Sequence, residues 1–205
     1  MIVIVNYGIG NLNSILNMLK NIGTKAAISS NISDIEKAKK LILPGVGAFD
    51  NGMKNLQDLG FISILNEKVI KNKTPILGIC LGMQLFTKKS EEGKRRGLGW
   101  IDADTIRFRF DQKQTGLKIP HMRWNSLNIQ KKSPLYNDFY QESRFYFVHS
   151  YHINCNNEED ILTKTYYGYN FVSSIQRDNI IGVQFHPEKS LKFGMKFLEN
   201  YVKFI

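Results

Sequence analysis

The fold is decided by the stretch PILGICLGMQ at residues 75–84. Residues 75–79 are apolar and typical of a buried strand, and the spacing of apolar residues after them predicts a helix over residues 81–88. Glycines flank Cys80 on both sides, and a glycine has no Cβ atom to obstruct a sharp bend. The stretch therefore predicts a strand, a tight turn at Cys80 and a helix, which is the arrangement of a nucleophile elbow.

An elbow of this kind gives Cys80 the surroundings of a reactive thiol. The sulfur is expected at the carboxyl edge of the sheet, where open α/β sheets place their sites. The positive end of the following helix favours the thiolate form, and the backbone N–H of Leu81 is free to stabilise an oxyanion. Cys155, in an Asn-rich stretch without glycines, has none of these features and is interpreted as a bystander.

Strand and helix patterns alternate on both sides of this stretch. The patterns predict strands at residues 1–5, 26–29, 41–43, 75–79 and 180–185, and helices at 12–22, 33–39, 52–72, 81–88 and 190–204. Such alternation favours an α/β fold with a mostly parallel central sheet flanked by helices.

Between residues 98 and 175 the pattern changes to β-type runs. These runs, at residues 105–110, 145–149, 164–169 and 172–176, are expected to form an antiparallel extension of the same sheet. No repeat and no Gly-, Ser- or Pro-rich linker interrupts the chain, so residues 1–205 are predicted to form a single domain.

The composition excludes several classes of protein. Lys and Arg number 28 against 18 Asp and Glu, a net charge of +10, but the cations are scattered, so nucleic acid is not the expected partner. No apolar run reaches the ~18 residues of a membrane span, and the first five residues lack the flanks of an export signal. Two cysteines without ligand spacing predict neither a disulfide framework nor a metal site. A cytoplasmic location is expected.

A thiol nucleophile needs a base, and His186 is the best candidate among the four histidines. It follows the last predicted strand in the sequence HPE, residues 186–188. Pro187 sharpens the turn off the strand, and Glu188 can fold back to orient the imidazole and favour its protonated form. The predicted catalytic group is therefore Cys80, His186 and Glu188.

A second glycine-rich turn, PGVG, follows the strand at residues 41–43. Neighbouring parallel strands end at the same sheet edge, so the N–H of Val46 is a candidate second donor to an oxyanion. A plain glycine turn explains the same residues equally well.

Taken together, these motifs resemble the class I, triad-type glutamine amidotransferases. The matching segments are GICLGMQ at 78–84, PGVG at 44–47 and HPEKS at 186–190. Further segments resemble the glutaminase subunits of imidazole glycerol phosphate synthases: NYGIGNL at 6–12, EEG at 91–93, GLG at 97–99, PHM at 120–122, WN at 124–125 and YFVHSY at 146–151. The resemblance spans residues 1 to about 200 and implies a flavodoxin-like amidotransferase fold.

The resemblance implies a specific reaction without a cofactor. Cys80 attacks the side-chain amide of L-glutamine and releases ammonia through a thioester, His186 moves the protons, and Glu188 orients His186. The N–H groups of Val46 and Leu81 hold the oxyanion. The residues implied in glutamine binding are Gly45, Gln84, Glu92, His149, Ser150 and Tyr151.

The resemblance also implies a partner. Ammonia passes to a (β/α)₈-barrel cyclase subunit, which forms a heterodimer with the glutaminase and makes imidazole glycerol phosphate and an aminoimidazole carboxamide ribotide (AICAR) in histidine biosynthesis. In the family, activity depends on the loaded partner, and the loop at 44–47 is a suitable gate because glycines permit a peptide to rotate. The implied interface residues are Asn11, Arg123, Trp124 and Lys189.

Arg123 is a departure from the family pattern, which has glycine there. A long cation near the partner interface is compatible with an altered partner. The alternative is a paralogous glutaminase subunit that supplies ammonia to a sugar-modifying amidotransferase in surface polysaccharide biosynthesis. A silent regulatory scaffold and a cysteine peptidase fit less well, because the catalytic group is complete and a peptidase has no need of Gln84 and Glu92.

Overall fold

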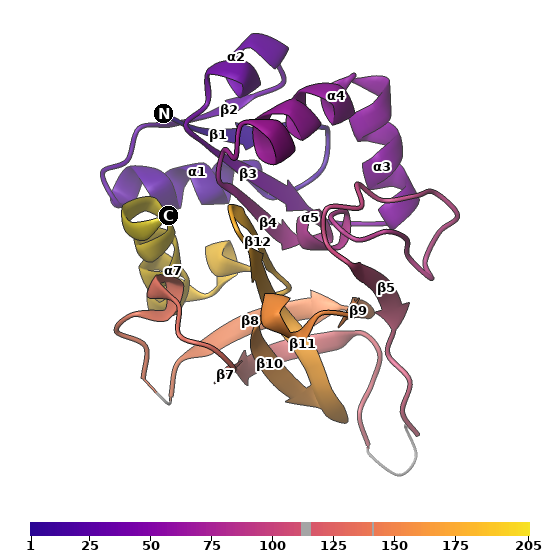
Figure 1. The fold of residues 1–205 in the computed structure, drawn as a ribbon. Coiled ribbons are helices and arrows are strands. Elements are labelled where there is room, and N and C mark those ends of the chain that lie inside the picture. Colours follow the sequence, from indigo (N-terminus) through magenta and orange to yellow (C-terminus); the bar gives the residue numbers. More distant parts are fainter. Residues whose placement is uncertain (112–115, 141) are drawn as a thin grey trace.

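The computed structural model describes residues 1–111, 116–140 and 142–205. A ten-stranded sheet runs through the molecule, and its first part is parallel with the strand order β2-β1-β3-β4-β12 (Figure 1). These strands are β1 (Ile2–Val5), β2 (Ala26–Ser29), β3 (Lys40–Gly45), β4 (Ile76–Cys80) and β12 (Ile180–Val183). This is the order of flavodoxin-like sheets, so the predicted fold class is confirmed.

The antiparallel extension is also confirmed, because β11 pairs with β12 in antiparallel orientation and continues the sheet. β10, β7, β9 and β5 complete it. The bounds are β5 (Ala103–Arg107), β7 (Asn128–Ile129), β9 (Tyr151–Cys155), β10 (Ile161–Tyr167) and β11 (Tyr169–Arg177). The main path of the sheet therefore runs from β2 at one edge to β7, a strand of 2 residues, at the other, and β9 and β5 form a branch from β11.

The predicted run at 145–149 does not join this sheet. It forms β8 (Arg144–His149), which pairs with β6 (His121–Ser126) in a separate two-stranded ribbon and meets the segment after β12 through one isolated bridge, between Tyr146 and His186. Phe145 and Phe147 on β8 are fully buried, so the run does face the core as its pattern indicates. The prediction is wrong about its pairing partner, because alternation reports burial of one face and not which strand lies beside it.

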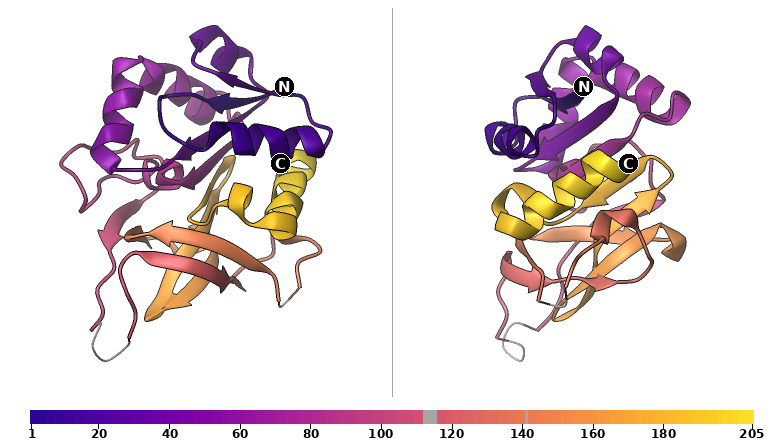
Figure 2. Two further views of the ribbon diagram at one scale, coloured as in Figure 1. Left: turned by 180° about the vertical axis from the view of Figure 1, so that it is seen from behind. Right: turned by 90° about the vertical axis from the view of Figure 1, so that its left-hand side faces the viewer.

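Helices cover both faces of the parallel strands (Figure 2). On β1, Ile2 and Ile4 pack in the same cluster as residues of α1 and α7, whereas Val3 and Val5 pack with α3 and α4. The helical bounds are α1 (Leu12–Asn21), α2 (Ile32–Lys37), α3 (Phe49–Asp58), α4 (Phe61–Asn66), the π-helical η1 (Glu67–Lys71), α5 (Leu81–Gln84), α7 (Leu191–Phe204) and the 3₁₀ turns η2 (Pro134–Tyr136), η3 (Glu158–Asp160) and η4 (Pro187–Lys189).

Three helices differ from the predicted ranges. α5 ends at Gln84 rather than residue 88, because the next carbonyls accept hydrogen bonds from residues 97–101 instead of from their own helix, as in Leu98 N to Leu85 O at 2.8 Å. The predicted helix at 52–72 is divided at Gly60, whose φ is 69°. α2 covers Ile32–Lys37 rather than residues 33–39, and its N-cap is Asn31, whose side chain accepts from Ser33 N.

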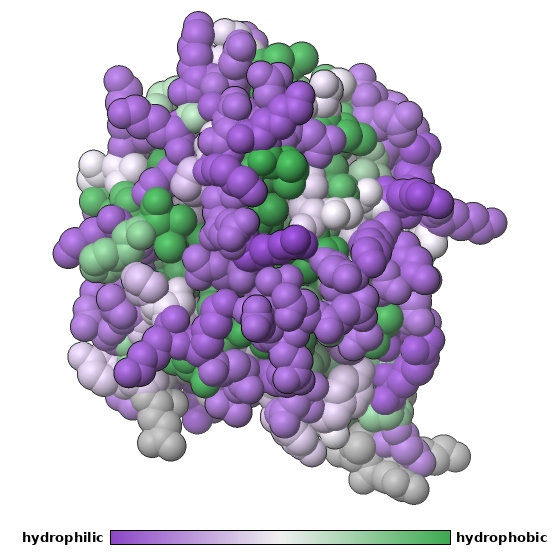
Figure 3. Space-filling view, in the orientation of Figure 1, coloured by the Kyte–Doolittle hydropathy of each residue, from purple (hydrophilic) through white to green (hydrophobic). Residues whose placement is uncertain are grey.

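The face shown in Figure 3 is largely hydrophilic, with apolar groups lying between polar side chains. Within the described ranges, no helix combines the length and apolar character needed to span a bilayer.

The packing of α5 against β3 leads to a prediction about stability. A Cβ atom at Gly82 would lie 1.8 Å from the carbonyl oxygen of Leu43, and neither backbone can yield without moving the sheet edge. Gly82→Ala is expected to lower the free energy of unfolding by more than about 3 kcal/mol, measured by urea denaturation. Gly23→Ala is the control: its φ of 80° is strained but no atom lies within 4 Å of the added Cβ, so it should cost about 1 kcal/mol. Equal losses in both would contradict the argument.

Candidate active site

Cys80 occupies a strained backbone position at the end of β4. Its φ of 54° and ψ of −111° lie outside the regions that side chains other than glycine favour. β4 is hydrogen-bonded to β3 on one side and to β12 on the other, so the sheet holds the strand while the chain turns directly into α5. The thiol therefore lies at the helix N-terminus, and Cys80 is only 7% exposed.

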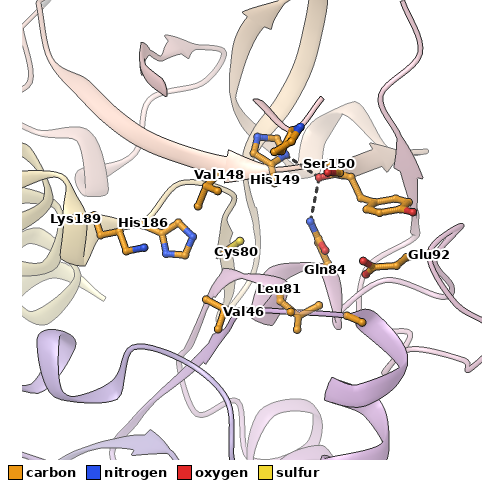
Figure 4. A pocket seen from close by; sticks show the side chains of 14 residues that line it. Val46, Cys80, Leu81, Gln84, Glu92, Val148, His149, Ser150, His186 and Lys189 are labelled. Carbon is orange, nitrogen blue, oxygen red and sulfur yellow. Dashed lines mark hydrogen bonds between the residues drawn. The ribbon is translucent and has the colours of Figure 1, made fainter. Parts of the chain in front are cut away.

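His186 and Glu188 form a buried pair beside this turn. His186 follows β12, the parallel neighbour of β4, and its Nδ1 lies 2.8 Å from Glu188 Oε1, with both side chains at most 2% exposed. The Nδ1 contact leaves Nε2 as the ring nitrogen available to Cys80 (Figure 4). Nε2 is buried and makes no hydrogen bond of standard geometry with any residue that the structure describes.

The charges around His186 favour its protonated form. Burial by itself lowers the pKa of this imidazole, but the Cys80 sulfur and the Glu188 carboxylate together raise it further than burial lowers it, so the pKa lies above its usual value. A protonated His186 balances a negative sulfur on one side and a carboxylate on the other. The site is therefore suited to a thiolate–imidazolium pair.

A cavity of about 650 Å³ opens onto the Cys80 sulfur (Figure 4). It is lined by Val46, Gly47, Ala48, Cys80, Leu81, Gln84, Glu92, Pro120, Val148, His149, Ser150, Tyr151, His186 and Lys189. Ten of the residues singled out from the sequence are in this lining, although they come from distant parts of the chain. Cys155 lines a different cavity, and burial raises the pKa of its thiol to about 11.

Gln84 and Glu92 present acceptor atoms to this cavity. Gln84 Nε2 donates to the Tyr151 carbonyl and to Gln184 Oε1, both at 3.1 Å, so the side-chain oxygen is the atom left for a ligand. Glu92 Oε2 accepts from Phe49 N at 2.8 Å, at the N-terminus of α3. A ligand group with several N–H donors would fit between the two side chains.

The end of β3, at Gly45, and the loop that begins with Val46 border the same site. Gly45 is paired with Cys80 in the β3–β4 register, and a Cβ atom there would lie 2.6 Å from the Tyr7 hydroxyl and 2.9 Å from Leu81 Cβ. Val46 and Leu81 both line the cavity. The N–H of Leu81 opens α5 and has no intrahelical partner, which leaves it available to an oxyanion.

The ring of His149 is engaged with the protein. Its Nδ1 lies 2.7 Å from the Tyr151 carbonyl, and its Nε2 lies 3.0 Å from His121 Nδ1. Together with His152, these rings pack around Phe108. Burial lowers the pKa of all three imidazoles, to about 3 for His121 and about 4 for His152, so they are neutral at pH 7.

The four predicted interface residues come from different elements, and one of them, Lys189, lines the cavity. Its Nζ lies 5.6 Å from the centre of the Tyr146 ring. Trp124 also contacts that ring, edge to face, and is 40% exposed. Arg123 is exposed, with its guanidinium 5.9 Å from the Tyr167 ring.

Asn11 precedes α1, and its Oδ1 accepts from Ser14 Oγ at 2.9 Å. Asn11, Arg123 and Trp124 are not part of the cavity lining.

The sequence interpretation missed two residues close to Cys80. Gln184 Nε2 lies 3.6 Å from the Cys80 sulfur, although Gln184 belongs to an apolar strand pattern that gave no sign of this contact. Tyr7 is fully buried, and burial together with the nearby Cys80 charge raises the pKa of its phenol. Its position in a glycine-rich loop after β1 was the only available signal.

Comparison with known proteins identifies the class that this fold and site define. A family model for class-I glutamine amidotransferases matches residues 3–204, and the chain belongs to this family. The fold is similar to that of a putative GMP synthase protein from Thermoplasma acidophilum, with a TM-score of 0.71 at 17% identity over 98% of this chain and 91% of that one. It is also similar to PurLQS from Thermotoga maritima, with a TM-score of 0.74 at 16% identity over 98% and 96%.

Closer relatives define the subgroup. The chain is 54% identical to imidazole glycerol phosphate synthase subunit HisH 2 of Methanococcus maripaludis over 99% of both chains. It is 48% identical to subunit HisH 2 of Pseudomonas aeruginosa over 100% of both, and 48% identical to subunit HisH 1 of Campylobacter jejuni over 99% of this chain and 100% of that one. Within the class, the chain is a member of the HisH subunit family.

The neutral histidines predict a steep loss of stability in acid. Their pKa values are lower in the folded chain than the unfolded value of about 6.5, so below pH 6.5 the unfolded chain binds protons that the folded chain does not. Stability is therefore lost as the pH falls from about 6.5 towards 4. Each such group contributes about 1.4 kcal/mol per pH unit, and His152→Gln should reduce the slope by that amount in urea titrations between pH 6 and 5.

His186→Gln is the control for this measurement. The raised pKa of His186 keeps it protonated in the folded state over this range, and the unfolded chain is largely protonated there too, so its removal should leave the slope nearly unchanged. A slope that responds to His186→Gln and not to His152→Gln would contradict the assignment.

Proposed function

We propose that the chain is a glutaminase subunit that hydrolyses L-glutamine to L-glutamate and passes the ammonia to a (β/α)₈-barrel cyclase subunit. The observation that carries the proposal is the buried His186–Glu188 pair beside Cys80, at the base of a cavity whose far side presents acceptor oxygens.

The reaction follows from the charges at Cys80 and His186. The thiolate attacks the amide carbon of glutamine, the carbonyl oxygen takes the negative charge, and the N–H groups of Leu81 and Val46 stabilise it. The His186 imidazolium gives its proton to the leaving nitrogen, which departs as ammonia and leaves a thioester. Neutral His186 then takes a proton from water, the hydroxide attacks the thioester, and the sulfur leaves as thiolate with glutamate.

We infer an orientation of glutamine in the cavity from the residues that line it. Its α-ammonium group is bound by the side-chain oxygen of Gln84 and by Glu92, because both offer acceptors to a group that only donates. Its α-carboxylate is bound by the backbone of residues 149–151. The loop with Gly45 and Val46 then lies at the amide end, where it can open and close the oxyanion site.

The pathway is proposed from the relatives. We infer that the chain acts as a single domain, residues 1–205, in a cytoplasmic heterodimer whose cyclase subunit carries out the lyase step and makes imidazole glycerol phosphate and AICAR in histidine biosynthesis. No cofactor, nucleic acid or membrane takes part in this scheme. The three relatives that are 48% to 54% identical to the chain all bear the name imidazole glycerol phosphate synthase. The alternative acceptor in polysaccharide biosynthesis is therefore not favoured.

We propose that β6 faces the cyclase. Met122, Arg123 and Trp124 are consecutive exposed residues of this strand, with Met122 62% exposed. Lys189 and Trp124 contact Tyr146 from different elements, so the exposed surface of β6 continues to the edge of the cavity. Asn11 is the fourth residue assigned to this interface. Ammonia released at Cys80 would thus leave towards the bound cyclase.

Replacing the nucleophile tests the reaction. Cys80→Ala should abolish glutamine-dependent synthesis by the complex, because no other described residue can form the thioester, while synthesis from added ammonium salt continues. The measurement is product formation with each nitrogen source. Cys155→Ser should leave both rates unchanged. Glutamine-dependent turnover in Cys80→Ala would overturn the assignment of the nucleophile. Failure of the unmodified chain to complement a histidine auxotroph that lacks this subunit would overturn the assignment to histidine biosynthesis.

The partner surface is tested by Trp124→Ala. Truncating a half-exposed aromatic residue at the centre of an interface typically costs about 2 kcal/mol, so the affinity for the cyclase should fall about 30-fold, as measured by titration calorimetry. Ile32→Ala provides a control, since Ile32 is 47% exposed on α2, away from β6. The surface assignment fails if both variants bind the cyclase with equal affinity.

A further inference from the structure

Gln184 is a fully buried polar residue with no part in the scheme above. It lies between β12 and His186, and its backbone N–H donates to the Ser173 carbonyl at 2.9 Å. Its side chain is directed at the active site: Nε2 lies 3.6 Å from the Cys80 sulfur, and Oε1 lies 3.1 Å from Gln84 Nε2. Gln184 therefore bridges the nucleophile and a residue of the glutamine site.

The direction of this bridge follows from a single backbone carbonyl. The oxygen of Tyr151 can only accept, so Gln84 must present its NH₂ group to it, at 3.1 Å. The same NH₂ group donates its second hydrogen to Gln184, which must therefore accept this hydrogen bond through its side-chain oxygen. The amide of Gln184 is left with its own NH₂ group facing the sulfur. The opposite orientation would place two donors, or two acceptors, against each other.

The Tyr151 carbonyl is itself held in place. It also accepts from Nδ1 of His149, at 2.7 Å, which makes Nε2 of that ring an acceptor for His121 Nδ1 at 3.0 Å. Both rings are buried and lack positive charge at neutral pH. Donor and acceptor roles are therefore defined at every step from His121 to Cys80.

We propose that Gln184 is a further catalytic residue of this site, whose side-chain N–H donates to the Cys80 sulfur and stabilises it as a thiolate, and that Gln84 positions this donor. Hydrogen bonds to charged groups are stronger than those between neutral groups, and a thiolate that is 7% exposed has little water to replace them. His186 also faces the sulfur, but its proton is consumed when ammonia leaves.

An amide hydrogen is not acidic enough to transfer, so this contact stabilises the sulfur without protonating it. The donor is thus available twice in one cycle. It first holds the attacking thiolate, whose charge moves to the carbonyl oxygen as the sulfur–carbon bond forms. It then holds the thiolate again when water has attacked the thioester and the sulfur–carbon bond breaks. The proposal uses the proposed function only in taking Cys80 as the nucleophile.

The test is the pH dependence of Cys80 alkylation in the full chain without glutamine or cyclase. A Cys155→Ser background leaves one thiol, and iodoacetamide reacts with the thiolate form. Losing one hydrogen bond to a charged group is expected to move the midpoint of the alkylation profile up by about one pH unit in Gln184→Met. Gln184→Glu, which places a carboxylate near the sulfur, should move it further, and Gln84→Met should move it in the same direction by less.

Gln184→Met carries the test if the glutamate variant does not fold, because it is nearly isosteric and neutral. Thermal unfolding distinguishes this catalytic role from a purely structural one, because a structural role would lower the melting temperature of Gln184→Met with no change in its alkylation midpoint. An unchanged midpoint in folded Gln184→Met would overturn the proposal. Glutamine hydrolysis by the unmodified chain in complex with its cyclase is a separate readout: a shifted alkylation midpoint together with a complex that does not hydrolyse glutamine would contradict the proposed function while leaving the role of Gln184 intact.

Discussion

The close approach of α5 to β3 is the constraint on which the site depends. Gly82 packs so tightly against the carbonyl of Leu43 that any side chain there is excluded. This contact brings the start of α5 over the sheet edge and requires Cys80 to adopt a positive φ. The turn puts the sulfur between the loop after β3 and the chain leaving β12. The proposed oxyanion donors, nucleophile and base therefore lie at or just after the ends of three adjacent parallel strands, β3, β4 and β12.

The chain uses its four histidines in two opposite electrostatic states. His186 has charged groups on both sides, and they hold its proton despite burial. His121, His149 and His152 are buried among aromatic rings, and burial lowers their pKa values, so these imidazoles are neutral at pH 7. In the proposed reaction the first state supplies an acid, and the second gives His121 and His149 fixed donor and acceptor ends that hold the Tyr151 carbonyl in one orientation. Residue type alone does not distinguish these roles, because the surroundings of each ring decide them.

The sequence was informative where a role depends on neighbours in the chain. The glycines around Cys80 and the acid two residues after His186 are local, and the parallel core and its antiparallel extension followed from local patterns. The contacts of Gln184 could not be predicted, because Cys80 and Gln84 are far from it in the chain and the fold brings them together. The short length of α5 was missed for a similar reason: residues 97–101 take the hydrogen bonds that would have continued the helix. For most of the site residues, the sequence indicated which residues belong to the site, and the fold determined how their side chains are oriented.

The two ends of the sheet also bear on how such a chain behaves before it meets another protein. Unpaired strand edges invite other strands to add on, and proteins avoid this by keeping edge strands short or charged. Here β7 offers only 2 residues and β2 only 4, and β5, at the end of the branch, is hydrogen-bonded to residues 88–91. The excess of cations, +10 overall, makes copies of the chain repel one another. Short or covered edges and a shared positive charge thus both act against strand addition between copies of the chain.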